Sequence, residues 1–143
     1  MAFATELTVR FGDCDRAGIA YYPVIFHYCH VAFEEFFERG VGIPYPTLVN
    51  ERHLGFPMGH IDASFESPFQ YGMKVTVRVE VLKVGTKSTQ WRYTFFDRDR
   101  GTRLARCVAD TVAVDMRKFT STAVPDDLRS AFARCGAPES DAV

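Results

Sequence analysis

The stretch FGDCDRAGIAYYPVIFHYCHVAFEEFFER, residues 11–39, places two carboxylates just before the longest apolar run of the chain. Pro23 suits the first turn of a helix and Gly40 the position just past its end, so we expect a helix over 23–39. Apolar side chains cover most of its circumference, and one narrow polar stripe interrupts them: His27, His30, Glu34 and Glu38. A helix that is apolar almost all round is buried, so other elements must wrap around it.

Alternating apolar and polar residues downstream predict the strands that do so. Residues 74–82 (KVTVRVEVL) place four valines on one face, and 88–96 (STQWRYTFF) place three aromatic rings on one face. Further strands are expected at 5–11, 60–69 and 102–115, with a charged hairpin at 97–101 and a short helix at 125–133. This order predicts an α+β fold in which one antiparallel sheet curls around the long helix.

Length and composition limit the class of protein. The 143 residues predict a single domain over 1–133, followed by a flexible C-terminal tail over 134–143. Because 17 basic and 18 acidic side chains nearly cancel, a nucleic-acid partner is not expected. Without a long apolar run or the features of a signal peptide, we expect a cytoplasmic protein that does not cross a membrane. The cysteines form no CxxC pair and are expected to be reduced: Cys14, Cys29, Cys107 and Cys135.

The two aspartates of the opening stretch suit acyl-transfer chemistry. Asp13 and Asp15 lie between a strand and the start of a helix, where unpaired N–H groups carry partial positive charge. A carboxylate there can attack a carbonyl carbon or activate water, while backbone N–H groups stabilise the developing oxyanion. The spacing fits a purely structural loop equally well, with one aspartate bonded to loop amides and the other solvated.

Metal and cofactor chemistry fit the sequence poorly. DCDRAG resembles the start of a calcium loop, but Ala17 and Val24 occupy its fifth and twelfth positions, where oxygen ligands are needed. His27 and His30 have the spacing of a ligand pair without an HExxH motif or a third ligand. The chain also lacks the GxSxG, P-loop and GxGxxG motifs. Neither a metal nor a cofactor is expected.

FGDCDRAGIAYYP closely resembles the signature of the 4-hydroxybenzoyl-CoA thioesterase family, roughly D-x-D-x-x-G-[IV]-x-[YW]-[YP]. The likeness extends over about residues 7–132 and includes DASF at 62–65 and the pair Lys87 and Ser88. It implies a hotdog fold, in which about five antiparallel strands curve around a central helix. It also implies an acyl-CoA thioesterase, which hydrolyses the thioester to a free acid and CoA.

The resemblance assigns roles to individual positions. Asp15 matches the catalytic aspartate, Asp13 supports the loop, and the backbone N–H of Tyr22 matches the group that polarises the thioester oxygen. Gly18 allows the tight turn between them. The residues expected to bind substrate are Gly18, Tyr21, His30, His60, Asp62, Ser64 and Lys87.

The substrate is expected to be an aromatic acyl-CoA. The pair Tyr22 and Pro23 resembles the branch that acts on 4-hydroxybenzoyl-CoA or benzoyl-CoA-like substrates, whereas members acting on short aliphatic chains often carry His at the second position. A short-chain aliphatic thioesterase and a non-catalytic acyl-CoA-binding hotdog protein are the alternatives.

The CoA phosphates and the assembly complete the expectations. Gly85 and Thr86 replace a basic pair found in the aromatic branch, which leaves Lys87 as the matching phosphate partner. Three arginines in or beside the charged hairpin are alternatives: Arg98, Arg100 and Arg103. Because a single sheet cannot hide its own edges, we expect association through an edge strand, and the resemblance implies a homodimer or homotetramer with active sites at the subunit interface.

Overall fold

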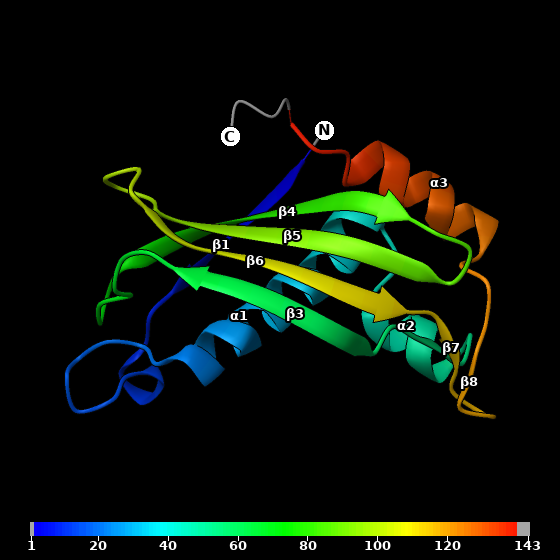
Figure 1. Cartoon of the computed structure of the whole chain (residues 1–143), viewed down its shortest axis with the longest axis horizontal. Helices are drawn as coiled ribbons and strands as arrows, with labels where there is room; N and C mark the ends of the chain where they lie inside the picture. Colours follow the sequence, from blue (N-terminus) through cyan, green and yellow to red (C-terminus); the bar gives the residue numbers. More distant parts are fainter. Residues whose placement is uncertain (1, 140–143) are drawn as a thin grey trace.

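The computed structural model describes residues 2–139 and shows a long helix lying across one face of a curved antiparallel sheet (Figure 1). The sheet has five strands in the order β1–β4–β5–β6–β3. Their bounds are β1 Phe3–Thr8, β3 Met58–Phe65, β4 Lys74–Val84, β5 Ser88–Asp97 and β6 Arg103–Val112. The expected hotdog arrangement is confirmed.

The central helix, α1 (Tyr22–Glu35), continues without a break into a π-helical segment, η2 (Phe36–Val41). The alternation of β4 and β5 points one row of side chains at this helix, as the sequence predicts. All seven are buried: Val75, Val77, Val79, Val81, Trp91, Tyr93 and Phe95. The Trp91 ring lies with its centroid 5.1 Å from Phe33 and 5.4 Å from Phe36. The core therefore lies between α1 and the concave face of the sheet.

Gly40 does not end the helix, contrary to expectation. The helical backbone runs on to Val41, and Gly42 follows it in the left-handed region with φ +88°. Gly40 serves close packing instead, because a Cβ there would lie 3.3 Å from the rings of both Phe3 and Phe36. The glycine that stops the helix is thus two residues further along.

Several strand boundaries also differ. The first strand ends at Thr8 rather than at residue 11, because Phe11–Asp13 forms a 3₁₀ turn (η1). The strand expected at 60–69 ends at Phe65, where the N–H groups of Glu66 and Ser67 both bond to the Leu104 carbonyl. A helix and a small second sheet were not predicted: α2 (Tyr45–Asn50), β2 (Leu54–Gly55), β7 (Val114–Asp115) and β8 (Thr120–Ser121).

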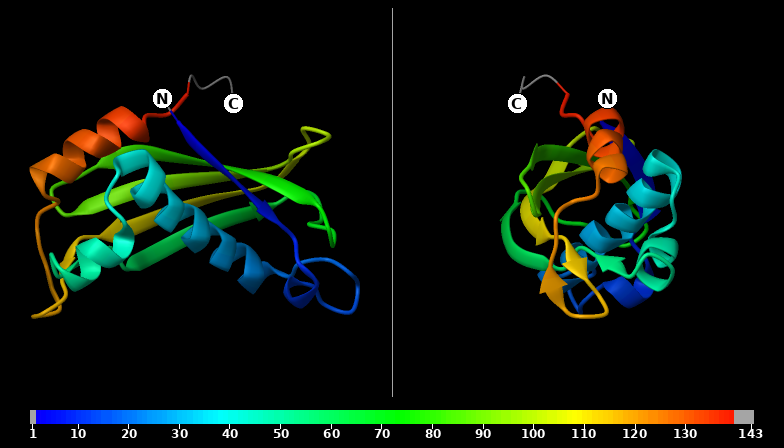
Figure 2. Two further views of the ribbon diagram at one scale, coloured as in Figure 1. Left: turned by 180° about the vertical axis from the view of Figure 1, so that it is seen from behind. Right: turned by 90° about the vertical axis from the view of Figure 1, so that its right-hand side faces the viewer.

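The C-terminal helix extends past its expected end. It spans Asp126–Cys135 (α3) and packs against β4 and η2, as Figure 2 shows from two sides. The Cys135 thiol donates to the Gly40 carbonyl at 3.0 Å, and the Gly136 carbonyl accepts from the Val81 N–H at 2.6 Å. The first residues of the expected tail are therefore part of the packed structure, while residues 140–143 lie outside the described part of the chain.

Candidate active site

Asp13 holds the loop between β1 and α1 in place through two hydrogen bonds. Its Oδ2 atom accepts a hydrogen bond from the Arg10 N–H at 3.0 Å, which closes the 3₁₀ turn. The same oxygen accepts from the Tyr28 hydroxyl at 2.8 Å, and Tyr28 belongs to α1. The sequence analysis missed Tyr28, because a partner fifteen residues away leaves no local pattern.

Asp15 lies at the start of a tight turn and is exposed. Its Oδ1 accepts from the Ala17 N–H at 2.8 Å, while its backbone bonds to Gly18 and Ile19, each at 3.0 Å. Gly18 has φ +80°, a conformation that favours glycine, so the predicted reason for a glycine here is confirmed. Within residues 2–139 no group donates to Oδ2 of Asp15, which therefore remains available for chemistry.

The loop is also held by the connection between β3 and β4. The Ala20 N–H donates to the Phe69 carbonyl at 2.9 Å, and the Tyr71 N–H donates to the Gly18 carbonyl at 3.1 Å. These bonds bring the end of β3 close to the start of α1. Segments that are distant in sequence therefore share one site.

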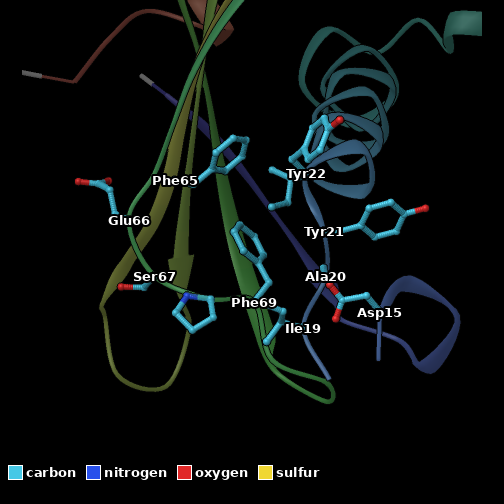
Figure 3. A pocket seen from close by; sticks show the side chains of 11 residues that line it. Asp15, Ile19, Ala20, Tyr21, Tyr22, Phe65, Glu66, Ser67 and Phe69 are labelled. Atoms are coloured by element: carbon cyan, nitrogen blue, oxygen red, sulfur yellow. The ribbon is translucent and has the colours of Figure 1, made fainter. Parts of the chain in front are cut away.

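A cavity of about 410 Å³ opens between these segments and has Asp15 on its wall. Figure 3 shows Tyr21 and Tyr22 on the side of α1, and Phe65 and Phe69 opposite them on the side of the sheet. Asp15, Tyr21 and Tyr22 come together as expected, whereas the two phenylalanines were not among the predicted site residues. The arrangement places a carboxylate on the wall of a largely aromatic cavity.

The start of α1, which borders this cavity, carries a hydrogen-bond donor that is unpaired within the described part of the chain. Tyr22 is the first residue of the helix, and no carbonyl or side chain within 2–139 accepts its backbone N–H. Pro23 follows it and has no N–H of its own. The free donor and the positive end of the helix dipole can together stabilise a negative oxygen at this place.

Asp15 also borders a second cavity, of about 500 Å³, on the outer side of the loop. The exposed rings of Phe11 and Tyr71 meet there edge to face, with centroids 5.6 Å apart. Cys14 lines the same space, and loss of water together with the carboxylates of Asp13 and Asp15 raises the pKa of its thiol. The thiol therefore remains protonated near neutral pH, which disfavours a nucleophilic role.

Of the seven predicted substrate-binding residues, Tyr21 alone lines the aromatic cavity; Gly18 borders the second cavity, and the other five lie elsewhere. His30 is further along α1 and contacts Glu34, with Nε2 and Oε2 2.6 Å apart. Three others, on β3, alternate with residues that face α1, so they lie on the outer face of the sheet: His60, Asp62 and Ser64. Within one chain, the structure does not bring these side chains to Asp15.

Lys87 lies in the turn between β4 and β5, where its Nζ donates to the Ser121 hydroxyl at 3.1 Å. The Asp15 loop is bonded to residues 69–73, which precede the other end of β4. Eleven residues of extended strand separate the two ends, or about 35 Å. The β1–α1 loop, which carries Asp15, and the β4–β5 turn, which carries Lys87, therefore lie at opposite ends of the sheet (Figure 1).

Two of the three alternative phosphate partners are already paired. Arg98 contacts Glu6 at 3.2 Å and Asp99 at 3.1 Å. Arg103 holds Glu66 through two hydrogen bonds of 2.7 Å, and this guanidinium lowers the pKa of the Glu66 carboxyl. No carboxylate pairs with the Arg100 guanidinium among residues 2–139, although the Arg100 backbone N–H donates to Asp97 Oδ1 at 3.3 Å.

Residues 9–132 match the family described as the Thioesterase-like superfamily. The chain belongs to this superfamily. It is 26% identical over 128 residues to the 1,4-dihydroxy-2-naphthoyl-CoA hydrolase of Nostoc punctiforme. This alignment covers 90% of this chain and 84% of that protein. The expected likeness to thioesterases is confirmed at the level of the superfamily, although this relative is named for a substrate other than 4-hydroxybenzoyl-CoA.

Solved structures show the same fold. A 1,4-dihydroxy-2-naphthoyl-CoA thioesterase from Synechocystis superposes with a TM-score of 0.85 at 19% identity, covering 96% of this chain and 100% of that one. A gentisyl-coenzyme A thioesterase superposes with a TM-score of 0.80 at 25% identity, covering 92% and 99%. This member of the superfamily is an acyl-CoA thioesterase with the hotdog fold.

Two further findings concern the described residues alone. No helix among them is long and apolar enough to cross a membrane. Within 2–139, no three side chains of His, Cys, Asp or Glu gather in a way that could hold a metal ion.

Proposed function

We propose that this thioesterase hydrolyses aromatic acyl-CoA substrates, with Asp15 as the reactive carboxylate and the Tyr22 N–H as the oxyanion donor. One observation carries the proposal: a carboxylate with a free oxygen and an unpaired helix N–H border the same aromatic cavity. A carboxylate nucleophile or base needs an unoccupied oxygen, and an oxyanion needs a donor that is not already bonded.

Hydrolysis then follows one of two balanced routes. In the first, Asp15 attacks the carbonyl carbon, the C–S bond breaks with its electrons on the CoA thiolate, and water hydrolyses the resulting anhydride. In the second, Asp15 takes a proton from water, the hydroxide attacks the same carbon, and the C–S bond breaks with its electrons on the CoA thiolate, which takes the proton from Asp15. In both routes the Tyr22 N–H stabilises the negative oxygen. After single turnover in ¹⁸O-labelled water, ¹⁸O in Asp15 would demonstrate the anhydride route with water attacking the Asp15 carboxyl carbon, since the general-base route places no solvent oxygen in Asp15.

The substitution Asp15→Asn tests the catalytic assignment. It preserves the size of an exposed side chain but removes the negative charge, so kcat should fall by about 100-fold or more while the fold is retained. Asp126→Asn is the matched control, because Asp126 is an exposed aspartate at the start of α3, outside the cavity. An Asp15→Asn protein with wild-type kcat would show that Asp15 is not the reactive carboxylate.

The aromatic substrate class is supported by the lining of the cavity and by the names of similar proteins. Four aromatic side chains border the space beside Asp15: Tyr21, Tyr22, Phe65 and Phe69. The similar proteins are named for 1,4-dihydroxy-2-naphthoyl-CoA and gentisyl-CoA, both of which carry hydroxylated aromatic acyl groups. Flat rings packed against aromatic side chains gain dispersion and quadrupole contacts that a short aliphatic chain lacks.

A thiol-release assay with a substrate panel tests this class. The panel comprises acetyl-, hexanoyl-, benzoyl-, 4-hydroxybenzoyl-, gentisyl- and 1,4-dihydroxy-2-naphthoyl-CoA. The expected result is a kcat/KM at least about tenfold higher for the aromatic substrates, since each 1.4 kcal/mol of differential binding is worth a factor of ten. Higher kcat/KM for acetyl- or hexanoyl-CoA would reject the aromatic assignment and leave a short-chain thioesterase.

The same proposal includes a homodimer with its active sites at the interface. β3 is an edge strand, and six of its eight residues are exposed. Pairing of β3 with its copy covers this edge in both chains, while β1 remains the other edge of each sheet. If Lys87 binds the CoA phosphates, it must do so at the site of the other copy, because it lies at the far end of its own sheet.

A further inference from the structure

Tyr28 belongs to the second turn of α1 and is 4% exposed. Its ring lies beside Phe69, with centroids 6.1 Å apart, and its hydroxyl donates to Asp13 Oδ2 at 2.8 Å. Burial and this hydrogen bond to the Asp13 carboxylate raise the pKa of Tyr28 above its ordinary value. The hydroxyl therefore remains a neutral donor throughout the pH range of an enzyme assay.

This bond is the one side-chain hydrogen bond, among the described residues, that joins the loop of residues 10–19 to α1. The remaining loop bonds run within the loop or to the β3–β4 connection. Residues 15–18 are all exposed, so packing alone does not fix their position. The Asp13–Tyr28 bond is thus a direct link between the loop and the helix.

Each of the two bonded residues lies on the same segment as one of the two proposed reacting groups. Asp13 is two residues before Asp15, whereas Tyr28 is six residues after Tyr22 on the same rigid helix, about 9 Å along its axis. A change in the Asp13–Tyr28 distance therefore moves Asp15 relative to the Tyr22 N–H. Displacements of about 1 Å between reacting groups can cost 100-fold in rate.

We propose that Tyr28 is a positioning residue, whose hydroxyl acts through Asp13 to set Asp15 at the correct distance from the Tyr22 N–H. This rests on the proposed roles of Asp15 and Tyr22. Tyr28 is not among the residues that line the cavity. The link therefore affects the chemical step and leaves substrate binding nearly unchanged.

Tyr28→Phe is the first test, because it removes only the hydroxyl and keeps the ring beside Phe69. The expected result is a kcat lowered by about tenfold with KM changed by less than twofold. Tyr45→Phe is the matched control: that hydroxyl accepts from the Phe56 N–H at 2.9 Å, and its ring also packs on α1, without contact to the loop. Both variants should lower the urea midpoint, but only Tyr28→Phe should lower kcat.

A double-mutant cycle tests whether Tyr28 acts through Asp13. Asp13→Ala should lower kcat at least as far as Tyr28→Phe does, because it also removes the bond to the Arg10 N–H, and adding Tyr28→Phe to Asp13→Ala should cause no further loss. Asp13→Asn retains an acceptor oxygen for the Tyr28 hydroxyl and should recover most of the rate. Multiplicative losses in the cycle, or wild-type kcat for Tyr28→Phe, overturn the inference.

The inference and the proposed function can fail separately. An inactive Asp15→Asn enzyme beside a fully active Tyr28→Phe enzyme rejects the positioning role alone. A fully active Asp15→Asn enzyme rejects both, since no reactive carboxylate would then remain for Tyr28 to position.

Discussion

At the scale of single residues, the loop that carries Asp15 depends on backbone conformation more than on side-chain packing. Residues 15–18 are exposed, and the turn closes through the bonds from Gly18 N to the Asp15 carbonyl and from Asp15 N to the Ile19 carbonyl. That geometry requires φ +80° at Gly18. A side chain at this position would meet no atom within 4 Å, so the only obstacle to substitution is the backbone itself.

Gly18→Ala should therefore lower the free energy of unfolding by about 1–2 kcal/mol, the cost of a left-handed conformation in a residue with a Cβ. Gly12→Ala is the matched control in the same loop, because Gly12 also has open space around it but has no positive φ. Its stability should stay within about 0.5 kcal/mol of wild type or rise slightly. Urea denaturation of both variants measures the difference, and equal stabilities would show that the loop relaxes.

At the scale of elements, α1 and η2 contribute aromatic rings that pack against the concave face of the sheet. Phe36 is fully buried and packs with Trp91 at 5.4 Å, with Phe3 at 5.7 Å and with Phe132 at 6.0 Å between ring centroids. It thus joins β5, β1 and α3 to the central helix. These contacts place Phe36 at the centre of the fold.

Phe36→Ala should accordingly destabilise the protein by about 3–5 kcal/mol, through lost burial and the cavity left behind. Phe119→Ala should change stability by less than about 0.5 kcal/mol, because Phe119 is 76% exposed at the tip between β7 and β8. Chemical denaturation monitored by circular dichroism compares the two. A loss below 1 kcal/mol for Phe36→Ala would mean that the surrounding rings collapse into the space.

The same elements show what the sequence can predict. The valines of β4 and the aromatic residues of β5 repeat every second residue, and this period identifies both the strand and its buried face. Strands of two residues, such as β2, β7 and β8, are too short to show a period. The sequence predicts the helix end at Gly40 rather than Gly42, because a glycine needed for close packing and one needed for a left-handed turn look alike in a sequence.

The candidate site divides along a similar line. Asp15, Tyr21 and Tyr22 are neighbours in the chain, so a local motif was sufficient to bring them together. Phe65, Phe69 and Tyr28 are brought near Asp15 or its loop by the tertiary structure, so no local sequence pattern predicts their place there. The three polar residues of β3 differ, because their position follows from the sequence pattern: His60, Asp62 and Ser64 alternate with Ile61 and Ala63, which pack against the core, and therefore lie on the opposite face of the strand.

At the scale of the whole molecule, the distance between Asp15 and Lys87 means that the proposed site needs residues from two chains. Antiparallel pairing of β3 with its copy about a twofold axis runs the two sheets in opposite directions. The far end of one sheet, which carries Lys87, then lies towards the end of the other sheet that carries Asp15. Each proposed site therefore combines Asp15 of one chain with Lys87 of its partner.

Subunit complementation tests this arrangement. Asp15→Asn should be nearly inactive, and Lys87→Glu should raise KM for acyl-CoA by about tenfold, because it replaces an attraction to phosphate by a repulsion. When the two variants are unfolded together and refolded, half of the dimers are mixed, and each contains one site with both native residues. The mixture should then recover about a quarter of the wild-type sites with wild-type KM. Activity measured below KM detects this recovery, whereas a mixture no better than the average of the two variants would place both residues in the site of one chain or exclude Lys87 from it.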